Sequence, residues 1–101
     1  MNVELTKSAK AAIATLYCKY MERMKNKEPK LQARTFSTEI PAQSAILDSV
    51  KEDLPELKAA GFIEIYLYGD IKLLDKAIIF MENKTAENIK EWLSFASQFI
   101  P

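Results

Sequence analysis

The stretch Asp-Leu-Pro-Glu-Leu-Lys-Ala-Ala-Gly-Phe-Ile-Glu-Ile-Tyr-Leu-Tyr, residues 53–68, decides the fold class of this 101-residue chain. Asp53, with Glu56 three residues later, is typical of a capping box at the start of a helix. Pro55 fits the first turn, where its missing amide is not needed. It disfavours helical geometry in the residue before it, so a helix arriving from upstream is expected to end or kink near Asp53. Gly61 suits the left-handed position just past a helix end.

The residues after Gly61 predict a strand. Apolar Ile63, Ile65 and Leu67 alternate with more polar residues as far as Tyr68. A period of two is the signature of a strand with one buried face. The stretch is therefore a short helix, a glycine stop and a strand. A corner of this kind also fits other small α+β domains.

Length and composition favour a single domain over residues 1–101, with 83–101 as a C-terminal helix and possible dimerisation element. Hydrophobic residues make up 49% of the chain, enough for one modest core. The single cysteine, Cys18, excludes an internal disulfide and favours a reducing cytoplasm. No apolar run is long enough to span a bilayer, and no signal peptide is recognisable, so no membrane partner is expected.

Catalysis and metal binding have little support in the sequence. The chain has no histidine, which removes the commonest general base near neutral pH. One cysteine without histidine leaves a structural zinc site almost no ligands. The two glycines do not form a phosphate-binding loop. We therefore expect no enzyme activity, no catalytic residues, no cofactor and no metal.

The first half of the chain reads as mostly helical. Thr6 is a suitable N-cap for an amphipathic helix that reaches about Lys25. A polar break over residues 26–30 leads to a predicted short edge strand at 31–36. Helices are expected at 42–52 and 54–60, which would form a helix-turn-helix-like pair. A continuous helix over 42–60, kinked at the proline, is the alternative.

The second half is predicted to contain a hairpin and a last helix. Gly69-Asp70 suits a two-residue hairpin turn. The apolar run 77–81, Ala-Ile-Ile-Phe-Met, is predicted to be a strand covered on one face by a helix. Thr85 is expected to cap a final helix whose apolar stripe runs to Ile100.

The predicted order of elements is α, β, α, α, β, β, α. It resembles a winged-helix domain with an extra C-terminal helix. The resemblance rests on Leu57, the run 60–63 (Ala-Gly-Phe-Ile), the alternation to Tyr68 and the segment 77–81. It implies a small α+β domain in which helices surround a two- or three-stranded antiparallel sheet. It also implies DNA binding in transcription control as the commonest activity, although protein-binding modules share this architecture.

Charge is distributed unevenly along the chain. Residues 1–34 contain eight basic and three acidic residues, a net charge of +5, whereas residues 35–101 contain six and eleven, a net charge of −5. The expected recognition helix begins with two carboxylates and has no Arg, Asn or Gln to read bases. Weak or non-specific duplex binding would therefore use cations outside this helix. The alternative interpretation of the cations between residues 19 and 34 is that they form a solvated helix end. The candidates are Lys19, Arg23, Lys25, Lys27, Lys30 and Arg34, with Lys72 and Lys76 in the wing.

A second hypothesis is a protein interaction module or dimeric adaptor without nucleic-acid binding. The two terminal helices carry more large apolar residues than a small core needs, and exposed apolar patches mark partner surfaces. A homodimer through these helices is consistent, unless the residues simply pack on the sheet. The candidate interface residues are Tyr20, Met24, Trp92, Phe95, Phe99 and Ile100. The sequence alone narrowly favours the DNA-binding regulator.

Overall fold

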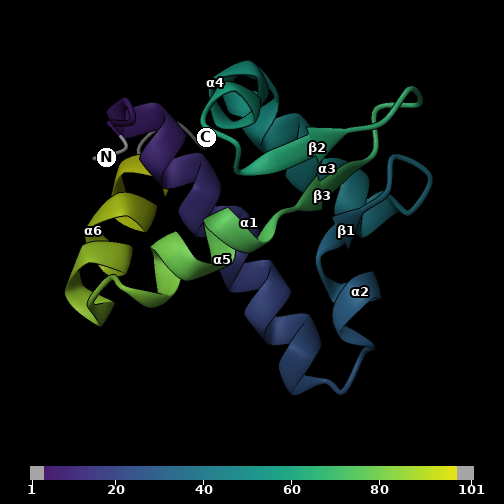
Figure 1. The fold of residues 1–101 in the computed structure, drawn as a ribbon, viewed down its shortest axis with the longest axis horizontal. Helices are drawn as coiled ribbons and strands as arrows, with labels where there is room; N and C mark the ends of the chain where they lie inside the picture. The colour runs from purple at the N-terminus through teal and green to yellow at the C-terminus, as the bar shows by residue number, and fades with distance from the viewer. Residues whose placement is uncertain (1–3, 98–101) are drawn as a thin grey trace.

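The computed structural model describes residues 4–97, with side chains as far as Ser94. The fold is α+β, as predicted, with helices around a three-stranded antiparallel sheet in a winged-helix-like order (Figure 1). The elements are α1 (Lys7–Lys25), α2 (Lys30–Ala33), β1 (Thr35–Phe36), α3 (Pro41–Val50), the 3₁₀ turn η1 (Lys51–Asp53), α4 (Leu54–Ala59), β2 (Ile63–Ile65), β3 (Ile71–Leu73), α5 (Asp75–Glu82) and α6 (Ala86–Ser97).

Helix α1 crosses the middle of the molecule in Figure 1 and contacts each of the other α-helices. It begins as predicted, because the Thr6 Oγ1 accepts a hydrogen bond from the Ala9 amide at 3.2 Å. Ile13 and Leu16 are fully buried. Ala11 and Ala14 are buried as well, although an amphipathic helix with one buried face was predicted here. Helix α1 is therefore enclosed on several sides rather than resting on one face.

The sheet has the strand order β1-β3-β2, so β3 is the central strand. Ile63 pairs with Leu73, and Phe36 pairs with Ile71, across antiparallel ladders. These four side chains are buried. The intervening residues Thr35, Glu64 and Lys72 are opposite one another on the other face of the sheet.

The corner between α4 and β2 forms as predicted. Gly61 has φ of +79°, in the left-handed region. Its amide donates to the Lys58 carbonyl, and the Phe62 amide donates to the Leu57 carbonyl, both at 3.0 Å. These two bonds define a Schellman motif, and the accompanying apolar pair, Leu57 and Phe62, is fully buried.

The hairpin after this corner is shorter than predicted. Strand β2 ends at Ile65, whereas the alternation predicted a strand to Tyr68. The Gly69 amide donates to the Tyr66 carbonyl at 2.9 Å, and the Tyr66 amide donates to the Asp70 carbonyl at 2.8 Å. With Gly69 at φ of +89°, this is a three-residue loop rather than the predicted two-residue Gly-Asp turn. The loop carries Leu67 away from the core.

The predicted strand at 77–81 is wrong, because these residues belong to helix α5. Strand β3, at Ile71–Leu73, takes the place in the sheet that the prediction gave to them. Ala77, Ile78 and Met81 are buried at helical spacing, and Asp75 lies in the first turn, where a carboxylate is favourable. The packing of α5 on α1 therefore outweighs the high strand propensity of residues 77–81.

The predicted edge strand at 31–36 is mostly wrong. Only Thr35–Phe36 pair with β3, while Lys30–Ala33 form the single helical turn α2. Pro29 precedes this turn as its N-cap residue. The Ala33 amide donates to the Pro29 carbonyl at 2.9 Å, which closes the turn before the strand can begin.

The helical region 42–60 is divided as predicted, since η1 separates α3 from α4. The predicted conformation of Leu54 is wrong, because it has helical φ of −58° and ψ of −43°. The break near Asp53 is nevertheless confirmed, since the ψ angles of Val50 and Asp53 are near zero. The effect of a following proline is a bias that packing can overcome.

Helix α6 begins as predicted, because the Thr85 Oγ1 accepts from the Asn88 amide at 3.1 Å. Trp92 stacks on Phe80 of α5, with ring centroids 6.0 Å apart. The predicted interface residues Phe99 and Ile100 lie outside the described residues.

Candidate interaction surfaces

Arg23, a predicted nucleic-acid contact, is held within the fold. Its Nη1 donates to the carbonyl oxygens of Ala33 and Thr35, and its guanidinium forms an ion pair with Glu28 at 3.2 Å. The guanidinium also lies 5.8 Å from the centre of the Phe36 ring. The side chain is only 14% exposed. Arg23 therefore joins the end of α1 to α2 and β1.

Arg34 is the one charged residue that is buried in the described part of the chain. Its Nη2 donates to the Oδ1 of Asp75 at the start of α5. The Arg34 carbonyl accepts from the Leu73 amide at 2.8 Å, which extends the pairing of β1 with β3. This arginine links β1 to α5 and has little surface to offer a phosphate.

The two lysines that the sequence placed in one wing lie in different elements, Lys72 in β3 and Lys76 in α5. The Lys76 Nζ donates to the Ala60 carbonyl at 2.7 Å and lies 5.8 Å from the centre of the Phe62 ring. It thus stabilises the C-terminus of α4, where a cation is favourable. Lys72 is half-buried on the sheet face, opposite Glu64.

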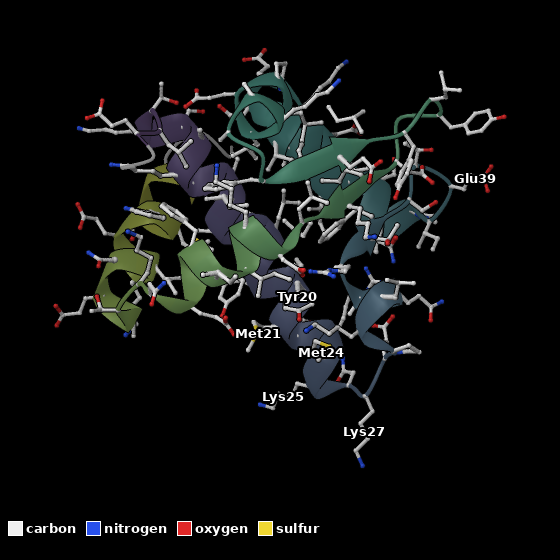
Figure 2. All side chains as sticks on the ribbon, viewed as in Figure 1. Tyr20, Met21, Met24, Lys25, Lys27 and Glu39 are labelled. Atoms are coloured by element: carbon white, nitrogen blue, oxygen red, sulfur yellow. The ribbon has the colours of Figure 1, made fainter. Side chains whose placement is uncertain are left out.

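The remaining predicted cations stay at the surface. Lys19 pairs with Glu22 at 3.4 Å, an exposed pair that contributes little stability. Lys25, Lys27 and Lys30 are exposed, and the structure gives them no ion pair within residues 4–97. Figure 2 shows Lys25 and Lys27 at the end of α1.

The N-terminus of α4, which the resemblance to winged-helix domains would direct at bases, is occupied by contacts within the chain. The predicted capping box is wrong, since Asp53 makes no side-chain cap to its own helix. Its Oδ2 accepts from the Ser8 Oγ at 2.8 Å. The Glu56 carboxylate accepts from the Thr6 amide at 2.8 Å and from its hydroxyl at 2.9 Å. Both carboxylates stabilise the start of α1 instead.

The predicted apolar interface is largely internal where the structure describes it. Tyr20 is buried in the core, so its prediction as an exposed interface residue is wrong. Met24 and Trp92 are half-buried and pack against the core. Trp92 also lies 5.7 Å from the ammonium groups of Lys10 and Lys84. The side chain of Phe95 lies outside the described part of the chain.

Sequence reasoning missed an exposed apolar group at the end of the hairpin. Leu67 is 100% exposed, Tyr68 is 88% exposed, and Tyr66 in the same turn is exposed as well. Ile40 is also exposed, in the loop whose Thr38 contacts this turn. We call Ile40, Tyr66, Leu67 and Tyr68 the tip patch. The strand pattern hid it, because alternation placed Leu67 with the core residues. The Gly69 that follows was the available signal that the strand ends earlier.

The loops that carry the tip patch are joined to each other. The Asp70 Oδ1 accepts from the Thr38 amide at 2.9 Å and from its hydroxyl at 3.1 Å. A Cβ on Gly69 would lie 3.3 Å from the Thr38 Cγ2, so the two loops are in close contact. The exposed apolar residues therefore sit on a braced turn.

Other kinds of site have little in the described chain to build on. Burial raises the pKa of the Cys18 thiol, partly offset by the charge of Lys19, so the reactive thiolate is disfavoured. Within residues 4–97, no three metal-ligating side chains lie together. No helix in this part of the chain has the length and apolarity required to cross a bilayer.

Comparison with known protein families, curated protein sequences and solved structures found no match. Function is therefore inferred from the surfaces described above. These are the tip patch and the lysines at the end of α1.

Arg23→Ala is expected to lower the free energy of unfolding by about 1–3 kcal/mol, because it removes hydrogen bonds to two carbonyl groups and an ion pair. Urea unfolding followed by circular dichroism measures this change. Lys25→Ala, two residues away and exposed, is the control and should change stability by less than about 0.5 kcal/mol. Equal, small effects of the two substitutions would contradict a structural role for Arg23.

Asp75→Asn is expected to destabilise the protein at neutral pH and progressively less in acid. The hydrogen bond and charge of Arg34 hold the pKa of the Asp75 carboxyl below its ordinary value. The stabilisation is therefore present above the unfolded pKa of about 3.9 and is lost as pH falls through the lower folded value. Urea midpoints of variant and wild type should converge below pH of about 4. Asp48→Asn, which removes an exposed carboxylate on α3, is the control. A difference in urea midpoint between Asp75→Asn and wild type that stays constant with pH would contradict the pairing.

Proposed function

We propose that this protein is a non-enzymatic, winged-helix-like interaction module that binds another protein through the tip patch. The observation that carries the proposal is the full exposure of Leu67 on a braced turn, with Tyr68 next to it. A reducing cytoplasm suits its single thiol.

The tip patch has the character of a binding surface. Exposed apolar residues that gather in one place mark partner sites, whereas scattered ones do not. Tyrosines are enriched among the residues that contribute most to protein interfaces. A hydrogen-bonded loop also loses little conformational freedom on binding, which favours affinity. The turn itself requires only the glycine, so its geometry does not account for Leu67 and Tyr68.

The surroundings of α4 support protein binding over base reading. The helix is six residues long, and its first-turn carboxylate contacts Thr6. Two of the eight predicted cationic contacts, Arg23 and Arg34, are held inside the fold, and Lys76 bonds the end of α4. The electrostatic term that supplies most DNA affinity is correspondingly reduced.

Site-specific photocrosslinking tests the proposal. With p-benzoylphenylalanine in place of Tyr68, illumination of expressing cells should give discrete protein adducts. The same photoreactive residue at Glu87, exposed on α6, is the control and should give none. Adding Leu67→Asp should reduce the Tyr68 adducts roughly tenfold, because a charge replaces a central apolar contact. Absence of adducts at position 68, or equal adducts at position 87, would overturn the proposal.

Weak, non-specific contact with duplex DNA is a second candidate, favoured by the three exposed lysines Lys25, Lys27 and Lys30. It predicts binding of a random duplex at about 50 mM salt that falls steeply as salt increases. Fluorescence anisotropy measures this binding, and Lys27→Glu with Lys30→Glu should abolish it. No binding by the wild type at low salt would exclude this second function.

A further inference from the structure

We infer that the partner of the tip patch is a second copy of this chain, which presents the basic surface around α2. We call Lys25, Lys27, Lys30 and Leu31 the basic end. The inference rests on the proposed function, because it names the occupant of the same tip patch.

The basic end has an apolar centre. Leu31, on the single-turn helix α2, is 66% exposed. Lys30 precedes it directly, and Lys27 lies before Pro29 in the loop that leads into the turn. The carboxylates of Glu22 and Glu28 are paired with Lys19 and Arg23. Asp75, whose charge also interacts with Lys30, is paired with Arg34. The basic end therefore combines an exposed leucine with three exposed lysines that are close to it in the sequence, and it carries net positive charge.

The tip patch has the opposite charge around it. Glu39 is exposed one residue before Ile40, and Glu64 is exposed two residues before Tyr66. The Tyr66 hydroxyl lies 3.5 Å from the Glu64 carboxylate. Asp70 adds a third carboxylate at the base of the loop. Lys72 is the only cation between residues 62 and 75 to offset these charges. An apolar centre with an acidic rim thus faces an apolar centre with a basic rim in the second copy.

Charge decides how the two copies meet. A symmetric contact of two tip patches would bring Glu39 and Glu64 of each copy toward those of the other, and like charges across an interface are costly. Two basic ends would repel each other in the same way. A tip patch against a basic end gives attraction at the rim and apolar burial at the centre.

The two surfaces lie apart in one molecule. Figure 2 shows Glu39, which precedes Ile40 of the tip patch, at one side of the molecule, and Lys25 and Lys27 at the far end of α1. One copy therefore leaves both of its surfaces open to other copies. Contacts between unlike surfaces are heterologous, so they propagate head to tail instead of closing as a symmetric dimer. The contact is small, which makes the association weak.

Complementation between two variants tests this geometry. Leu67→Asp removes the tip patch and leaves the basic end intact. Lys27→Glu with Lys30→Glu removes the basic end and leaves the tip patch intact. In sedimentation experiments, the wild type should form dimers and larger species at about 1 mM chain, and each variant alone should associate about tenfold more weakly or less. An equimolar mixture should form a one-to-one dimer that grows no further, because it retains a single matched pair of surfaces.

The matched control is Lys51→Glu with Lys90→Glu, the same charge change at exposed lysines outside the basic end. It should associate as the wild type does. Raising salt from about 50 to 500 mM should weaken the wild-type association, because rim charges are screened. Circular dichroism confirms that each variant is folded before it is compared.

A wild type that stays monomeric at about 1 mM, or a variant mixture that stays monomeric, would overturn the inference. The Tyr68 photocrosslink separates the two levels of the proposal. Adducts at twice the chain mass of 11.5 kDa support the second copy. Adducts only with other proteins overturn this inference and leave the proposed function standing, whereas no adducts and no association overturn both.

Discussion

The close enclosure of α1 is the constraint on which the rest of the structure depends. Four alanines, Ala9, Ala11, Ala12 and Ala14, are buried along its first half. Small side chains there let neighbouring helices approach from more than one direction, while Ile13 and Leu16 fill the space between them. A chain of this size forms one core, and α1 passes through it. The other helices and the sheet are thus positioned by their contact with this one helix, and larger side chains at the alanines would overpack the core.

Sequence reasoning succeeded where the structure is decided by neighbouring residues. Thr6, Gly61 and Thr85 act through hydrogen bonds or backbone angles within a few positions, and all three were predicted correctly. It failed where a distant contact decides. Residues 77–81 have the composition of a strand, but β3 pairs with β2 in the position predicted for them and with β1 on its other side. They form α5 because Ile78 and Met81 reach the core at helical spacing. The tip patch was also missed, because apolar and polar residues continue to alternate in the sequence as far as Tyr68, although the strand ends at Ile65.

The candidate site shows the same division between local and long-range information. A list of cations by residue number could not distinguish Arg23 and Arg34 from Lys25 and Lys27. Arg23 meets carbonyl groups ten and twelve residues along the chain, and Arg34 meets a carboxylate forty-one residues away. The guanidinium group is suited to such sites, because it donates several hydrogen bonds in fixed directions and is weakly hydrated. The lysines stayed at the surface, where a flexible, strongly hydrated ammonium group is favoured. The two residue types were therefore sorted by chemistry as the chain folded.

The same sorting limits which surfaces of this fold remain for recognition. Glu56 and Asp53 lie at the start of α4, yet they bond Thr6 and Ser8, so the end of the helix that would approach a groove instead holds α1 in place. Lys76 holds the other end of α4. Because both ends contribute to the fold, substitutions that made α4 a better reader of bases would also remove contacts that position α1. The fold does not depend in this way on the side chains at the hairpin tip. The shape of the turn comes from Gly69 and Asp70, whereas the side chains of Leu67 and Tyr68 are exposed to solvent. Substitutions at these two exposed positions are therefore expected to leave the fold intact, which makes the tip better suited than α4 to the proposed role in recognition.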